Sequence, residues 1–176
     1  MTMNTVDQTF LTYKRIYASL RVTKQIAESS DPTLQKLYKN IPFWGKSAAE
    51  FKLHMISTTD EFNDVMVLAL FAAFERELRI SVQNVLSENL HPQNSMISRL
   101  AELTGESIER WTITDLLSTL RNIVDGTMLS QVKQVYEYRN WVAHGKNQHK
   151  APAIKASPRF TFNLITRFVT QASAVL

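Results

Sequence analysis

The sequence of 176 residues contains no cysteine, only four glycines and only five prolines. Without cysteine, structural disulfides and thiolate metal sites are excluded. The scarcity of helix-breaking residues, together with runs rich in Ala, Leu, Glu, Gln and Lys, favours an all-helical protein. We therefore expect an all-α fold, an up-and-down bundle of about four to six helices, in a chain long enough to bury one core.

Long hydrophobic segments are also missing. The longest apolar run extends from Val65 to Phe74 and is followed by charged residues, so it is too short to cross a bilayer. The segment 1–7 is polar, which predicts no secretory signal. We expect a cytoplasmic protein without a membrane partner.

Two helices are predicted at the start of the chain. Apolar residues recur at helical spacing between Thr5 and Ser29, and basic residues occupy the other faces. Asp31 suits the N-cap of a short second helix, which has Pro32 at its first position and ends near Tyr38.

A loop is predicted at 40–57, because a proline and a glycine interrupt the helical pattern. The segment 58–61, Thr-Thr-Asp-Glu, has the pattern of a capping box and predicts a central helix over 60–88. We therefore divide the chain into an N-terminal helical extension, 1–57, packed on a helical bundle, 58–176, within one globular domain.

The rest of the predicted bundle consists of shorter helices. Turn and capping signals place them at 93–103, 115–124, 129–144 and from 158 onward. Thr114 is the predicted N-cap of the second of these helices. Gly145 is expected to close the third in a left-handed conformation.

Positive charge is concentrated around the end of the helix predicted at 129–144. The segment 133–159 has one acid, Glu137, and six basic residues, namely Lys133, Arg139, Lys146, Lys150, Lys155 and Arg159. Since the net charge of the whole chain is only +4, the remainder of the chain is slightly acidic. An anion such as RNA is the expected partner of this segment.

Helical geometry groups three polar side chains of this segment. At about 100° per residue, Asn140 and His144 lie within about 40° of one another, and Glu137 and His144 within about 20°. Arg139 lies about 140° from His144, so it reaches that histidine only through its length, through a distorted last turn, or from another subunit. Glu137, Asn140 and His144 therefore share one face.

An arginine and a histidine suffice in principle to cleave RNA without a metal. Histidine transfers protons near neutral pH, and a guanidinium binds phosphate oxygens in bidentate fashion. Asn140 would orient the imidazole or hold a phosphate oxygen. The spacing alone is more typical of a surface ion pair by Arg139 and a histidine near a helix C-cap, so this structural interpretation is kept as the alternative.

Arg139, Asn140 and His144, near the end of a late helix, resemble the signature of the HEPN superfamily. In that family an arginine is followed after about four to six residues by a histidine, often with a polar residue directly after the arginine. The resemblance implies a homodimeric helical bundle whose motifs face one cleft, and metal-independent endoribonuclease activity in a toxin or antiviral defence effector. It implies that Arg139 stabilises the scissile phosphate and His144 transfers protons. An antitoxin or regulatory protein would be a further partner.

Other residues are assigned supporting roles. Lys146 and Lys150 are predicted to bind the RNA backbone. Glu137 is a possible supporting residue, and Glu75 or Arg76 would also assist the site, unless Glu75 instead pairs with Arg79 four residues later.

Single histidines without helical partners predict no metal site, and no cofactor motif is present. Trp141 is typical of a core or interface residue, with base stacking as the alternative. The alternative functions are a non-catalytic dimerisation or protein-interaction module and an RNA binder without cleavage.

Overall fold

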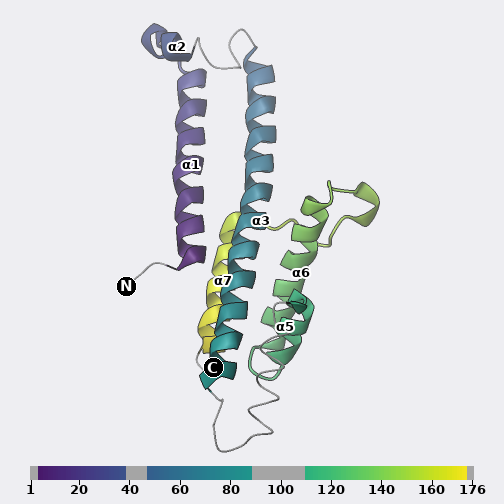
Figure 1. Cartoon of the computed structure of the whole chain (residues 1–176). Coiled ribbons are helices and arrows are strands. Elements are labelled where there is room, and N and C mark those ends of the chain that lie inside the picture. Colours follow the sequence, from purple (N-terminus) through teal and green to yellow (C-terminus); the bar gives the residue numbers. More distant parts are fainter. Residues whose placement is uncertain (1–3, 39–46, 89–109, 174–176) are drawn as a thin grey trace, which may run out of the picture.

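The computed structural model describes residues 4–38, 47–88 and 110–173 (Figure 1). In these ranges the chain forms six α-helices and one 3₁₀ helix, and it contains no strand. They are α1 (Thr5–Glu28), α2 (Pro32–Tyr38), α3 (Ala48–Glu88), α5 (Ile113–Thr119), α6 (Gly126–Ala143), η2 (Gln148–Lys150) and α7 (Pro158–Ser173). The predicted all-α bundle is confirmed. None of the described helices is long and apolar enough to cross a membrane.

The core lies around the second half of α3, which contacts α1, α5, α6 and α7. Phe74 meets Phe168 of α7 edge to face at 5.4 Å between ring centroids, and Phe10 of α1 stacks on Phe162 of α7 at 3.9 Å. Leu70, Phe71 and Phe74 are completely buried. Burial of each large apolar side chain stabilises the folded state by roughly 1.5–3 kcal/mol. The packing against this half of α3 therefore fixes the positions of the other helices.

The first half of α3 and the second half of α1 extend beyond this core as a two-helix hairpin (Figure 1). Its own core is small: Phe51 and Met55 are buried, with Leu20 and Ala27 packed against them. Leu53 is 68% exposed on the same hairpin. The hairpin therefore buries fewer apolar side chains than the rest of the described structure.

The start of α3 differs from the prediction of a loop over 40–57 and a helix from Asp60. The helix already begins at Ala48, and the part of the loop at 40–46 lies outside the described residues. Ser47 and Glu50 form the reciprocal hydrogen bonds of a capping box: the Ser47 amide donates to Glu50 Oε2 at 2.8 Å, and the Glu50 amide donates to Ser47 Oγ at 3.3 Å.

The predicted capping box at 58–61 lies inside α3 and caps nothing. Thr59 Oγ1 donates to the Met55 carbonyl at 2.7 Å, a back-bond to the preceding turn that a threonine in mid-helix commonly makes. The boundary between 57 and 58 therefore falls within one continuous helix, and the division into 1–57 and 58–176 stays a prediction.

The helices predicted from capping signals are confirmed in part. The first two predicted helices match α1 and α2, and the Thr33 amide donates to Asp31 Oδ1 at 2.8 Å, as expected of a capped start. Thr114 does not cap α5: Thr112 does, because its Oγ1 accepts a hydrogen bond from the Asp115 amide at 3.2 Å, and the Thr112 amide donates back to Asp115 Oδ2 at 2.8 Å. The helix predicted at 93–103 lies outside the described residues.

Candidate functional site at the end of helix α6

Helix α6 carries the arginine and the histidine singled out in the sequence. Asp125 caps its start by accepting a hydrogen bond from the Met128 amide at 3.0 Å. One face is buried in the bundle, through Met128, Leu129, Val132, Val135 and Tyr138. The opposite face of its last two turns remains available to solvent and to the following loop.

Gly145 ends α6 as the sequence predicts, with a φ of +80°. The Gly145 amide donates to the Val142 carbonyl at 3.1 Å, and the Lys146 amide donates to the Trp141 carbonyl at 2.9 Å. These two bonds form a Schellman motif, which satisfies carbonyls at the helix end. His144 is the C-cap residue, and its side chain is exposed.

The loop after α6 is held on α3 by a buried carboxylate. Asp64 is 4% exposed, and it accepts hydrogen bonds from the Tyr138 hydroxyl and from Lys146 Nζ. Burial, and then the hydrogen bond to Asp64, raises the pKa of Tyr138. Lys146 itself has a φ of +58°, uncommon for a residue with a side chain. Its ammonium group is thus engaged with Asp64, and its assignment as an RNA contact stays a prediction.

A hollow of about 550 Å³ lies beside the end of α6. It is lined by Glu137, Asn140, Trp141, His144, Asn147, Lys150, Ala151, Pro152 and Ala153. The three side chains that helical spacing places on one face, Glu137, Asn140 and His144, therefore line the same hollow, and Lys150 faces it from η2. This hollow is the candidate site.

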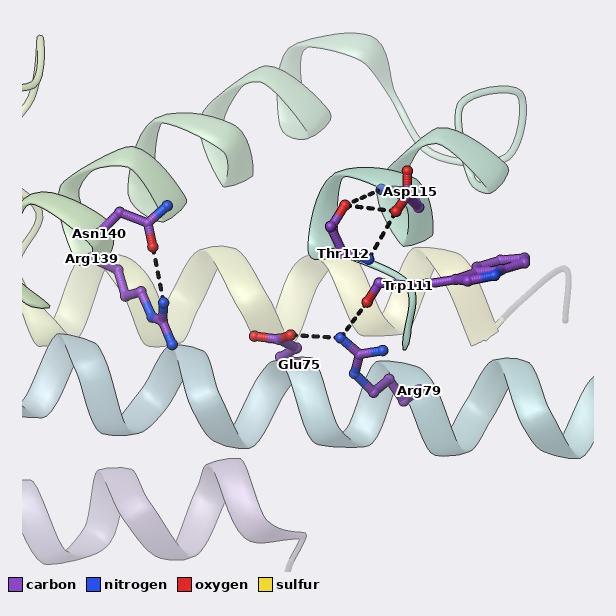
Figure 2. A network of polar contacts seen from close by, with 7 residues as sticks. All are labelled: Glu75, Arg79, Trp111, Thr112, Asp115, Arg139 and Asn140. Carbon is purple, nitrogen blue, oxygen red and sulfur yellow. Dashed lines mark hydrogen bonds and ion pairs between the residues drawn. The ribbon is translucent and has the colours of Figure 1, made fainter. Parts of the chain in front are cut away.

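Arg139 does not line the hollow and points toward α3 (Figure 2). Its Nη1 donates to Asn140 Oδ1 at 2.9 Å, and its buried Nε has no partner in the described part of the chain. Within one chain, Arg139 therefore does not share the hollow with His144. Asn140 links them, because it accepts from the arginine and lines the hollow beside the histidine.

The two possible supporting residues of α3 lie apart from the hollow. Glu75 accepts a hydrogen bond from Arg79 Nη2 at 2.7 Å, and the same nitrogen donates to the Trp111 carbonyl at 2.6 Å (Figure 2). The alternative of a local ion pair between Glu75 and Arg79 is confirmed. Arg76 is exposed on the same helix.

Asp64 of α3 and Asn147 have roles near this end of α6 that the sequence analysis missed, and the contact of Trp141 with Asn147 was not predicted either. Asp64 anchors the loop, and its place directly before the apolar run from Val65 to Phe74 is the signal that points to a buried, partnered carboxylate. Trp141 and Asn147 form one wall of the hollow, where Trp141 Nε1 donates to the Asn147 carbonyl at 2.7 Å. No sequence pattern places Asn147 there, because its position depends on the course of the loop.

The hollow brings together a group for proton transfer, a carboxylate, two amides, an ammonium group and an aromatic ring. In 4–38, 47–88 and 110–173, no three His, Asp or Glu side chains gather closely enough to hold a metal ion. The chain matches no model of a protein family, and comparisons with curated proteins and with solved structures gave no significant match. The chemistry of these side chains is therefore what a functional proposal has to rest on.

Proposed function

We propose that the protein is a metal-independent endoribonuclease of HEPN type, with its active site in the hollow at the end of α6. The observation that carries the proposal is the common placement of Glu137, Asn140, His144 and Lys150 around this one hollow. A histidine beside a cation is suited to a reaction in which a proton moves and a phosphate gains charge.

In the proposed reaction the ribose 2′-oxygen attacks the adjacent phosphorus and the bond from phosphorus to the 5′-oxygen breaks. His144 takes the proton of the 2′-hydroxyl or gives a proton to the leaving 5′-oxygen, and water carries out the other of these two transfers. Asn140 orients the imidazole or holds a phosphate oxygen, and Lys150 binds a flanking phosphate. The products are a 2′,3′-cyclic phosphate and a 5′-hydroxyl.

Arg139 has two roles in the proposal. In each subunit it holds Asn140 through the hydrogen bond at 2.9 Å. In a homodimer, the guanidinium of the second copy would leave Asn140 and stabilise the scissile phosphate, since Arg139 does not line the hollow of its own chain. Each active site is then composite.

The decisive test is incubation of the purified protein with mixed RNA in EDTA, comparing the wild type with His144→Ala. His54→Ala is the matched control, because His54 is an exposed histidine of α3 that does not line the hollow. We expect cleavage by the wild type and the control, cyclic phosphate ends, and loss of cleavage in His144→Ala. Intact RNA from a folded dimer overturns the proposal.

Such an enzyme would act in the cytoplasm as a toxin or an antiviral defence effector, restrained by an antitoxin or another regulatory protein. Expression of the wild type is then expected to stop growth, and the double substitution Arg139→Ala and His144→Ala to restore it. Equal and harmless expression of both would remove this biological role.

A second candidate function is a non-catalytic interaction module. It is favoured by the engagement of Arg139 with Asn140 and of Lys146 with Asp64, since both cations then serve the fold. This alternative predicts a stable complex without any RNA cleavage, so the EDTA experiment separates the two.

A further inference from the structure

The Trp141 ring is a fixed, half-buried wall of the hollow. Its Nε1 is tied to the Asn147 carbonyl, and its ring lies 5.8 Å from the ring of Tyr138, tilted by 39°. Tyr138 is in turn held by Asp64. An aromatic ring restrained in this way presents a preorganised face on which a planar ligand can stack, as nucleobases do in single-stranded RNA complexes.

The polar groups of the hollow have a defined donor and acceptor pattern. Asn140 Oδ1 accepts from Arg139, and Asn147 Oδ1 accepts from the His149 amide at 3.0 Å. Each of these amides therefore retains an NH₂ group that can donate to a ligand. Glu137 is the one carboxylate among the described residues that line the hollow, and a carboxylate only accepts.

This pattern matches one of the four RNA bases. The Watson–Crick edge of guanine has two adjacent donors, N1–H and the 2-amino group, which a carboxylate binds together, and its O6 accepts from an amide NH₂. Adenine and cytosine place a ring-nitrogen acceptor against the carboxylate, and uracil has a single donor between two acceptors. We propose that the hollow binds a guanine base of single-stranded RNA, stacked on Trp141 and recognised by Glu137.

The remaining groups of the hollow suit the backbone of the same nucleotide. Lys150 is exposed on η2 and supplies a cation for phosphate, while His144 is exposed at the C-cap of α6 beside Asn140. A base must leave its helical stack to enter the hollow, so the ligand is single-stranded or looped RNA. This inference rests on the proposed function and adds that cleavage occurs next to guanine.

The first test is binding of mononucleotides to the wild-type protein in EDTA, measured by calorimetry. GMP is expected to bind about tenfold or more tightly than AMP, CMP or UMP, since hydrogen bonds to a charged group are at stake. IMP, which lacks the 2-amino group, is expected to lose most of this advantage. Equal affinity for all four nucleotides overturns the inference.

The second test asks whether Glu137 and Trp141 carry the preference. Glu137→Gln is expected to reduce the ratio of GMP to AMP affinity about tenfold while UMP binding is unchanged. Glu61→Gln is the matched control, because Glu61 is an exposed acid of α3 that does not line the hollow. Trp141→Phe keeps a ring but loses the bond to Asn147, and is expected to weaken all four nucleotides together. A preference for GMP that survives Glu137→Gln overturns the assignment of Glu137.

The third test distinguishes free nucleotide from RNA and separates this inference from the proposed function. A short single-stranded oligoribonucleotide with one guanine is expected to bind more tightly than GMP, because Lys150 meets its backbone. Binding of GMP but not of the oligonucleotide overturns RNA as the ligand. A guanine preference in binding without any cleavage supports guanine recognition by the hollow and removes the nuclease. Cleavage without base preference supports the nuclease and overturns guanine recognition.

Discussion

The two sides of the end of α6 differ in how their charged groups are used. On the anchored side, Asp64 is almost completely buried and binds both Tyr138 and Lys146. On the open side, Glu137, His144 and Lys150 are exposed around a hollow. The same basic segment thus stabilises the fold through one lysine and offers another to a ligand, so that positive local charge alone does not identify a binding residue.

The largest loss of stability is expected on the anchored side, when Asp64 is replaced. Asp64→Ala leaves the Tyr138 hydroxyl and the Lys146 ammonium group without their acceptor, and we expect the free energy of unfolding to fall by about 3 kcal/mol. Urea denaturation followed by circular dichroism measures this change. His144→Ala, on the open side, should change it by less than about 0.5 kcal/mol. Similar losses from both substitutions would contradict the comparison.

The two lysines should separate stability from RNA binding. Lys146→Ala is expected to lower the free energy of unfolding by about 1–2 kcal/mol, because a nearly buried carboxylate loses its cation. Lys150→Ala should leave stability unchanged within about 0.5 kcal/mol but weaken RNA binding and reduce the slope of log affinity against log salt by about 1. Lys133→Ala is the control, since Lys133 is exposed on α6 and does not line the hollow. Loss of stability in Lys150→Ala and loss of RNA binding alone in Lys146→Ala would contradict these two assignments.

Tyr138 links stability on the anchored side to pH. Its pKa is raised in the folded protein, so the folded state favours the neutral hydroxyl. Its contribution is therefore fully present below the unfolded pKa of about 10 and decreases as pH rises above it, by up to about 1.4 kcal/mol per pH unit. Tyr138→Phe should cost about 1 kcal/mol at neutral pH and flatten this alkaline decrease.

Urea denaturation between about pH 8 and pH 11, compared for the wild type and Tyr138→Phe, measures this effect. The pKa of Tyr13 is also raised, first by burial and then by Tyr17, so Tyr13→Phe serves as the comparison variant. An equally steep alkaline decrease in Tyr138→Phe would show that other groups are responsible.

The contrast between the two sides also explains how far the sequence could predict them. Glu137, Asn140 and His144 are neighbours by helical periodicity alone, so their common face was predictable. The anchoring of Lys146 by Asp64 joins residues far apart in the chain, and no local pattern indicates it. The direction of Arg139 depends likewise on the space that α3 leaves beside α6.

The fold shows the same division between local and tertiary effects. Few glycines and prolines predicted the helical class, which depends on backbone propensity. The start of α3 was mispredicted because two segments carry capping-box patterns, Ser47 to Glu50 and Thr58 to Glu61. The helix starts at the first of these two segments, where Phe51 and Met55 pack beside Leu20 and Ala27. Such tertiary contacts override local capping patterns.

The smallest effect is expected where the loop makes a second, exposed contact with α3. Lys155 Nζ lies 3.2 Å from Asp60 Oδ1, but the two side chains are 65% and 52% exposed. Solvent and salt screen such a pair, so Asp60→Ala should lower the free energy of unfolding by less than about 0.5 kcal/mol. Asp60 and Asp64 lie one helical turn apart and each binds a lysine of the same loop, so the pair of alanine variants compares an exposed ion pair with a buried carboxylate that also binds Tyr138. Urea denaturation of Asp60→Ala and Asp64→Ala measures the two changes in the free energy of unfolding. If Asp60→Ala lowered it as much as Asp64→Ala, the loop would be held along its whole length rather than at one buried carboxylate.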